Sequence, residues 1–136
     1  NLGSLPGLGL LDIDFVFQRH KLVRPCRYSP TVQSGLGEAG PIQGYEIHTG
    51  TPIYRGAAPL LESDDGVDGA IDAERMVWGT FVHDLWKNER LTRCFVDGLR
   101  VRKGLPKLTQ PLPNHQDRFE QSIERLADAI EALGVF

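Results

Sequence analysis

The pattern of apolar and polar positions divides the chain into a strand-rich first part and a helical last part. Residues 8–17 are mostly apolar, β-branched or aromatic, which predicts one or two short strands. Residues 21–27 can continue this sheet, and their proline restricts them to an edge or an interrupted strand. Residues 29–42 are rich in glycine and proline, which predicts a loop. Residues 42–48 then form a strand, which the glycine and proline that follow are expected to end.

A hairpin is predicted in the middle of the chain. Residues 62–69 are acidic and contain two glycines, so we expect a surface loop there. Residues 70–72 and 76–83 then form the two strands of a hairpin around a turn at 73–75. The second strand is almost continuously apolar, which is typical of a strand covered on both faces.

Two amphipathic helices are predicted to close the sequence. The first starts after Asn88, a suitable N-cap, and ends before Gly104 and a proline. The second follows a proline-rich link at 105–113, and its apolar residues recur at helical spacing: Phe119, Ile123, Leu126, Ile130 and Leu133. Their burial would contribute about 8–15 kcal/mol. Ordering the helix costs more than that, so we expect it to dock on a sheet.

Composition and charge exclude several classes of function. The net charge is −3, which leaves no basic excess to neutralise phosphates, and we expect no nucleic-acid partner. No segment approaches the roughly 18 consecutive apolar residues of a membrane span, and no secretory signal is recognisable. Cys26 and Cys94 lie far apart, which favours packing residues over a disulfide or zinc site. These features predict a cytoplasmic protein without a membrane partner.

The length of 136 residues suits one domain, and we expect residues 1–136 to form a single one. The chain opens on Asn1, and its only methionine is Met76. We therefore expect it to be part of a larger protein.

Three segments resemble binding motifs but lack the necessary context. Residues 35–40 match the letters of a dinucleotide fingerprint, but Pro41 and a strand follow where a helix should receive the pyrophosphate. The acidic run at 64–68 lacks the glycine offset and final glutamate of a calcium loop, which predicts a solvated turn. The basic residues between 100 and 107 lie near a helix C-terminus, where cations are favoured without any ligand.

Two histidines lie at or near the ends of predicted strands. Strand alternation places Glu46 and His48 on one face and Tyr45 on the other. Glu46 and His48 can therefore hydrogen-bond or converge on one ligand, or they can belong to an exposed polar face. His83 ends the second strand of the predicted hairpin. A metal site built from Glu46, His48 and His83 is a further alternative, but no fourth ligand is suggested by spacing, so we expect no metal.

These segments, in this order, resemble the C-terminal part of the cobyric acid synthase family. The resemblance is carried by Gly-Tyr-Glu-Ile-His-Thr-Gly at 44–50, Asp-Gly-Ala at 68–70 and Val-Trp-Gly-Thr-Phe-Val-His at 77–83, and it extends over nearly the whole chain. The sister family of cobyrinic acid a,c-diamide synthases typically has histidine and phenylalanine in place of Tyr45 and Ile47.

The resemblance implies an α/β fold and a glutamine-dependent enzyme. The fold is the C-terminal portion of a flavodoxin-like class I glutamine amidotransferase, with a mixed sheet, an antiparallel hairpin and two C-terminal helices. In that family a cysteine thiolate attacks the glutamine carboxamide, and the resulting thioester forms as ammonia leaves. His83 matches the catalytic histidine, which acts as general base. We hypothesise that Glu46 orients His83, with Tyr45 and His48 as supporting residues.

The resemblance also implies partners beyond this segment. Intact members carry a separate synthetase domain, where ATP and Mg are expected. That domain uses the ammonia to amidate carboxylates of a corrinoid, adenosylcobyrinic acid a,c-diamide, in cobalamin biosynthesis. We expect glutamine as the substrate of this segment, no cofactor within it, and contact with the corrinoid only through the synthetase domain.

The chain departs from the family pattern at two places. Asp84 stands where the family usually has glycine, and Leu85 stands where other class I amidotransferases have an acid that orients the histidine. The nucleophilic cysteine belongs before the matching segment, and neither Cys26 nor Cys94 is on the required strand-to-helix turn. We therefore expect no glutaminase activity from these residues alone. A non-catalytic docking module is the alternative, and the exposed edge of a truncated sheet leaves self-association open.

Overall fold

A computed structural model describes residues 3–74, 76–112 and 114–134. The chain falls into two units, Asn1–Cys94 and Phe95–Phe136, and each is described by itself. The described strands all lie in the first unit.

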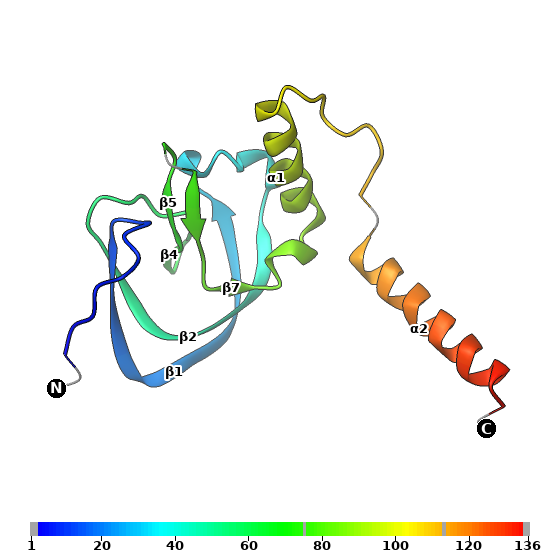
Figure 1. Ribbon diagram of the computed structural model, residues 1–136. Helices are drawn as coiled ribbons and strands as arrows, with labels where there is room; N and C mark the ends of the chain where they lie inside the picture. Colours follow the sequence, from blue (N-terminus) through cyan, green and yellow to red (C-terminus); the bar gives the residue numbers. More distant parts are fainter. Residues whose placement is uncertain (1–2, 75, 113, 135–136) are drawn as a thin grey trace. The chain divides into compact units, whose positions relative to one another are not determined.

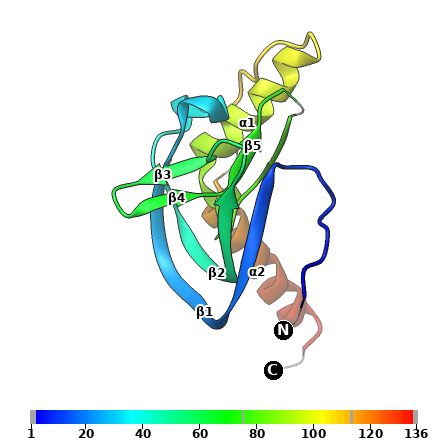
Figure 2. The same ribbon diagram turned by 90° about the vertical axis from the view of Figure 1, so that its left-hand side faces the viewer.

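A five-stranded sheet forms the centre of the first unit (Figure 1). Its two long strands, β1 (Ile13–Pro30) and β2 (Ile42–Tyr54), pair along most of their length. On the far side of β2 lies the short strand β7 (Val82–His83). The sheet is extended beyond the end of β1 by a small hairpin of β3 (Leu61–Ser63) and β4 (Gly66–Asp68), shown in Figure 2. The acidic segment predicted as a loop thus contains a hairpin.

A second, two-stranded sheet confirms the predicted hairpin but shortens it. β5 (Ala70–Asp72) pairs with β6 (Val77–Gly79), with Ile71 opposite Trp78. Within the predicted turn at 73–75, Arg75 lies outside the described residues. The continuous strand expected over 76–83 is wrong, because β6 and β7 belong to different sheets and two residues between them belong to neither.

The predicted end of the 42–48 strand at Gly50 and Pro52 is also wrong. β2 continues through both residues, which lie opposite Phe17 and Phe15 of β1. A proline is tolerated there because β7 pairs only with Tyr45 and Glu46, which leaves the later part of β2 at the edge of the sheet. Pro25 is tolerated for the same reason, because β1 at that point pairs only with β2 and its other side is an edge of the sheet.

The predicted α/β class, with an antiparallel hairpin and two C-terminal helices, is confirmed. The expected mixed sheet is not seen, because every strand pair among the described residues is antiparallel. A parallel pair needs a long crossover connection, which is usually a helix. Here both α-helices follow the last strand, so they cannot supply one between strands.

The connection between β1 and β2 is the segment that mimics a dinucleotide fingerprint. It contains two short 3-10 turns, η1 (Val32–Ser34) and η2 (Gly37–Ala39), and then enters β2 directly. No α-helix begins within this described segment, so the helix N-terminus that would receive a pyrophosphate is not formed there.

The core of the first unit gathers residues from β2, the 60–61 region and the start of α1 (Glu89–Arg102). Its largest fully buried side chains are Ile42, Leu60, Leu61 and Leu91. α1 begins directly after Asn88, as predicted, and the backbone carbonyl oxygen of Asn88 accepts a hydrogen bond of 3.0 Å from the N–H of Thr92. The side-chain amide of Asn88 bonds to both backbone groups of Gln43, each at 2.9 Å. An amide side chain can match a peptide group in this way, and it ties the chain before α1 to the start of β2.

The last helix of the second unit, α2 (His115–Ala132), forms where the apolar spacing predicts it. Asn114 caps it by accepting a hydrogen bond of 2.7 Å from the backbone N–H of Gln116, and Pro113 before it lies outside the described residues. Within the second unit, four of the five residues of its apolar stripe are more than half exposed: Phe119, Ile123, Leu126 and Leu133. The docking of this stripe on a sheet stays a prediction. The estimated burial free energy applies only when another surface covers the stripe, and the estimate does not identify that surface. Neither described α-helix combines the length and apolar character that crossing a bilayer requires.

Candidate functional site

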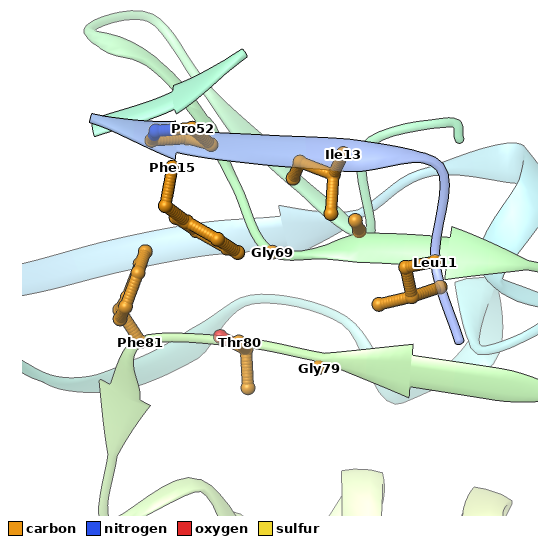
Figure 3. Close-up of a pocket in the computed structure, with 9 residues that line it drawn as sticks. Leu11, Ile13, Phe15, Pro52, Gly69, Gly79, Thr80 and Phe81 are labelled. Carbon is orange, nitrogen blue, oxygen red and sulfur yellow. The ribbon is translucent and has the colours of Figure 1, made fainter. Parts of the chain in front are cut away.

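An apolar cavity of about 290 Å³ lies where β1 passes the corner between β6 and β7 (Figure 3). Phe15 and Phe81 meet edge to face there, with ring centroids 5.6 Å apart. The lining side chains carry no charge. Free glutamine carries a carboxylate, an ammonium group and an amide, and burying these groups without partners is unfavourable. This cavity therefore does not suit glutamine.

His83 lies at the end of β7 and packs against Tyr45 of β2. The two residues are directly opposite in the sheet, and their rings stack with centroids 5.0 Å apart and planes 14° from parallel. Both side chains are exposed. Stacking restricts the orientation of the imidazole, and exposure leaves its nitrogens accessible. Within the described residues, neither nitrogen has a hydrogen-bond partner.

Gly44 allows β7 to approach β2 closely enough for this arrangement. A Cβ atom at Gly44 would overlap the backbone carbonyl oxygen of His83 and lie 2.7 Å from Cγ1 of Val82. Any side chain at this position would therefore force β7 away from β2. This close approach explains the glycine that opens the Gly-Tyr-Glu-Ile-His segment.

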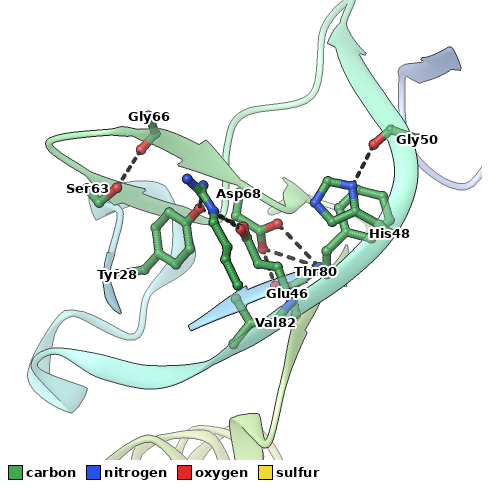
Figure 4. A network of polar contacts seen from close by, with 11 residues as sticks. Tyr28, Glu46, His48, Gly50, Ser63, Gly66, Asp68, Thr80 and Val82 are labelled. Carbon is green, nitrogen blue, oxygen red and sulfur yellow. Dashed lines mark hydrogen bonds and ion pairs between the residues drawn. The ribbon is translucent and has the colours of Figure 1, made fainter. Parts of the chain in front are cut away.

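Glu46 lies on the opposite face of β2, in a buried polar cluster (Figure 4). Its carboxylate accepts a hydrogen bond of 2.6 Å from Nε of Arg24 and one of 2.7 Å from the hydroxyl of Tyr28. Burial raises the pKa of Glu46, but the hydrogen bonds from Tyr28 and Arg24 outweigh it and hold the pKa below its usual value. The carboxylate is therefore ionised at neutral pH.

The hypothesis that Glu46 orients His83 is contradicted by this geometry. Tyr45 is the residue opposite His83, and strand alternation turns the next residue to the other face. The side chain that restricts the orientation of the His83 imidazole is therefore Tyr45, whose ring stacks on it.

His48 shares the face of Glu46, as predicted from strand alternation (Figure 4). Its ring stacks on Phe81 with centroids 4.2 Å apart and planes 15° from parallel. Its Nδ1 lies 2.8 Å from the carbonyl oxygen of Gly50. Because a carbonyl oxygen can only accept, Nδ1–H donates this hydrogen bond. His48 thus supports the segment that leads to His83. Among the described residues, no three potential ligands are grouped to hold a metal ion, and the alternative site of Glu46, His48 and His83 is not formed.

Asp68 is a buried carboxylate that sequence reasoning missed. The prediction placed it in a solvated turn, but it is only 3% exposed. It accepts hydrogen bonds from the hydroxyl of Thr80 and, at 3.3 Å, from the backbone N–H of Phe81. Burial raises the pKa of Asp68, and these hydrogen bonds offset the effect only in part. The Asp-Gly-Ala tripeptide at 68–70 was the available sequence signal.

Residues 1–91 match the family model of the CobB/CobQ-like glutamine amidotransferase domain. This chain belongs to that family. The matched range contains His83 and every residue of the buried clusters around Glu46 and Asp68.

Curated relatives of this amidotransferase family are similar along nearly the whole chain. The cobyric acid synthase of Gloeobacter violaceus is 37% identical over 131 residues, which cover 95% of this chain and 25% of that protein. The cobyric acid synthase of Desulforamulus reducens is 39% identical over 142 residues, which cover 96% of this chain and 27% of that protein. The one from Synechocystis sp. is 30% identical, with 96% and 26% covered. The chain therefore spans about a quarter of the length of these relatives.

Asp84, which departs from the amidotransferase pattern, adopts the conformation that glycine favours. Its φ is 62° and its ψ is 16°, in the left-handed region. Aspartate tolerates this region better than most residues, and here its carboxylate also forms an ion pair of 2.7 Å with Lys87. This left-handed turn after the histidine accounts for the glycine that the resemblance leads us to expect at position 84.

The two cysteines of this amidotransferase segment are poorly placed for nucleophilic attack. Cys26 lies within β1, opposite Gly44. Burial, followed by the negative charges of Glu46 and Asp68, raises the pKa of its thiol to about 11, so the reactive thiolate is disfavoured at neutral pH. Cys94 is half-buried within α1. Neither residue is on a strand-to-helix turn.

Proposed function

We propose that His83 is the general base of a glutamine amidotransferase to which this chain contributes its C-terminal segment. The observation that carries the proposal is the exposed imidazole at the end of β7, stacked on Tyr45 within the family's matched range. The nucleophilic cysteine would be supplied by another part of the protein. It would approach His83 from the exposed face of the sheet that carries Tyr45.

The proposed reaction uses the imidazole as a proton carrier. Neutral His83 takes the proton from the cysteine thiol, and the thiolate attacks the carboxamide carbon of glutamine. The C–N bond breaks as the imidazolium returns the proton to the leaving nitrogen, which gives ammonia and a thioester. Water then hydrolyses the thioester to glutamate and regenerates the thiol. The exposed, ring-stacked geometry suits this role because the imidazole must meet both the thiol and water.

For the whole protein, we propose cobyric acid synthase activity. The ammonia would pass to a separate synthetase domain that binds ATP and Mg and amidates carboxylates of adenosylcobyrinic acid a,c-diamide in cobalamin biosynthesis. Three curated relatives that bear the name cobyric acid synthase support this proposal.

A chimera tests the role of His83. The 131-residue segment of the Gloeobacter violaceus relative that matches this chain is replaced with the present sequence, and glutamine hydrolysis is measured as glutamate release. We expect activity in the chimera, a loss of about 10²–10⁴-fold with His83→Gln, and no change with His20→Gln, which alters an exposed histidine of β1. Equal activity of the His83→Gln and His20→Gln chimeras would exclude the proposed base.

A non-catalytic docking module derived from an amidotransferase is the second candidate. The placement of both cysteines inside β1 and α1, away from any described strand-to-helix turn, favours it for the isolated segment. The reading frame before Asn1 separates the two. A cysteine on a strand-to-helix turn with a nucleotide-binding domain further upstream supports the enzyme, whereas a start codon directly before Asn1 supports the docking module. We expect no glutamine hydrolysis by residues 1–136 alone, and His83-dependent hydrolysis by them would contradict the need for an external cysteine.

A further inference from the structure

The backbone at the corner between β6 and β7 needs hydrogen-bond partners that the two sheets do not provide. Only Thr80 and Phe81 separate the two strands, yet β6 pairs with β5 and β7 pairs with β2. The backbone of a residue at such a corner loses its place in either ladder, and its polar groups must find other partners. His83 follows this corner by only two residues, so the direction of the corner determines where its imidazole lies.

Asp68 supplies those partners. Its carboxylate accepts a hydrogen bond from the Thr80 hydroxyl and another from the Phe81 backbone N–H. The Thr80 hydroxyl oxygen in turn accepts a hydrogen bond of 3.0 Å from the backbone N–H of Val82. One buried carboxylate thus binds, directly or through one hydroxyl, three consecutive residues that end immediately before His83 (Figure 4).

The position of Asp68 is itself tightly defined. A Cβ atom on the next residue, Gly69, would overlap the backbone carbonyl oxygen of Gly79 and lie 3.1 Å from Cβ of Leu60. The hydroxyl of Tyr54 donates a hydrogen bond of 2.6 Å to the carbonyl oxygen of Gly69. The end of β4 is therefore packed directly against the end of β6, and the carboxylate has little freedom to move.

Phe81 is held from a second direction, because its ring stacks on His48 of β2. Asp68 fixes its backbone, and His48 limits its side chain. The histidine in turn is oriented by its hydrogen bond to Gly50. The hydrogen bond to Asp68 links the corner to β4, and the ring stack links it to β2, which also carries Tyr45 on its other face.

We propose that Asp68 is a positioning residue for His83, acting through the Thr80 hydroxyl and the Phe81 N–H to direct β7 toward Tyr45. The inference rests on the proposed function only in that His83 is the group being positioned for chemistry. Asp68 does not contact the imidazole, and it acts entirely through the intervening backbone.

Nuclear magnetic resonance of the 136-residue chain tests the geometry without any catalysis. Backbone amide spectra report whether β1 and β2 are intact, and nuclear Overhauser contacts between the rings of Tyr45 and His83 report the place of the imidazole. We expect Asp68→Asn and Thr80→Val to abolish the ring contact while the β1–β2 amide signals persist. Thr80→Ser keeps the hydroxyl and should retain the contact.

Asp65→Asn is the matched control, because Asp65 is an exposed carboxylate on the turn of the same β3–β4 hairpin. It should leave the ring contact unchanged. An intact contact in folded Asp68→Asn and Thr80→Val proteins would overturn the proposal. Global loss of β1–β2 signals in both variants would also overturn it, since Asp68 would then support the whole fold and not the corner.

Activity in the chimera then separates this inference from the proposed function. We expect Thr80→Val to lower kcat about 10–100-fold, the size of effect that a small misplacement of a catalytic group produces, with little change in KM and with rescue by Thr80→Ser. If the chimera shows no His83-dependent activity, the proposed function fails, and the ring-contact measurement still decides the role of Asp68. A displaced ring with unchanged kcat would overturn positioning for catalysis.

Discussion

The two faces of the sheet at β7 place their ionisable groups in opposite environments, one buried and hydrogen-bonded and the other exposed. On the buried face, Glu46 is 2% exposed and its carboxylate is held by Arg24 and Tyr28. On the other face, the His83 imidazole is exposed, and its described neighbour is the ring of Tyr45. The carboxylate has fixed hydrogen bonds and no access to a substrate. The imidazole is accessible, and among the described side chains it packs against Tyr45.

This difference shows how a short strand such as β7 can present an exposed imidazole on one face while buried polar groups lie on the other. β7 has only two residues and therefore few ladder hydrogen bonds. We propose that the buried polar groups behind it fix its direction. On the exposed face, the described residues give the His83 imidazole no hydrogen bond that would compete with the thiol or water of our proposal. In our proposal the buried polar groups set the geometry of β7, and the exposed histidine stays accessible for proton transfer.

The largest expected effect comes from removing the cation of the buried face. Arg24→Met leaves the Glu46 carboxylate buried without its charged partner. We expect a loss of about 2 kcal/mol in the free energy of unfolding, below the range for a fully buried pair because the Arg24 side chain is 44% exposed. Urea unfolding measures it.

The controls for this variant use the same strand. Arg27→Met, which alters an exposed arginine of β1, should change stability by less than about 0.5 kcal/mol. Adding Glu46→Gln to Arg24→Met should recover part of the loss, because no uncompensated charge remains. Equal stabilities of the Arg24→Met and Arg27→Met proteins would show that the buried pair does not hold this face.

A second change disrupts the contact between the two strands themselves. Gly44→Ala places a methyl group against the backbone of His83, so β7 must move away from β2. We expect a loss of about 1–1.5 kcal/mol on urea unfolding, near the low end for an overpacked site because β7 lies at the edge of the sheet and can move. The Tyr45–His83 ring contact should also be lost. Gly37→Ala is the control, because a Cβ there meets nothing within 4 Å. If both substitutions preserve the ring contact, close approach at Gly44 is not what places His83.

The smallest effect is a difference in pH dependence between the two buried carboxyl groups. The pKa of Glu46 is lowered from 4.5, so its stabilisation is complete above that value and is lost as pH falls through the folded pKa. The pKa of Asp68 is raised from 3.8, so its contribution is greatest below that value and declines as pH rises through the folded pKa.

Urea unfolding at stepped pH between about 3 and 7 checks both signs. The stability difference between the wild type and Glu46→Gln should shrink on acidification, and that between the wild type and Asp68→Asn should shrink on alkalinisation. Parallel curves for the two variants would mean that the two carboxyl groups share one electrostatic environment.

Local sequence patterns determined the elements whose signals lie within a few residues. Strand alternation gave the shared face of Glu46 and His48, hairpin chemistry gave the pairing of 70–72 with the apolar run that follows, and helical spacing gave α2. The place of His83 at a strand end was also predictable, since the strand and its end are encoded next to each other.

Tertiary structure alone decided the partners of the polar groups. Glu46 bonds to Arg24 across 22 positions, Thr80 to Asp68 across 12, and Asn88 to Gln43 across 45. The break between β6 and β7 depends on the same long-range placement. Periodicity shows which face a side chain takes, but a buried carboxylate binds whatever donors the fold brings to it. The sequence therefore determined which residue carries the imidazole, and the fold decided what holds it in place.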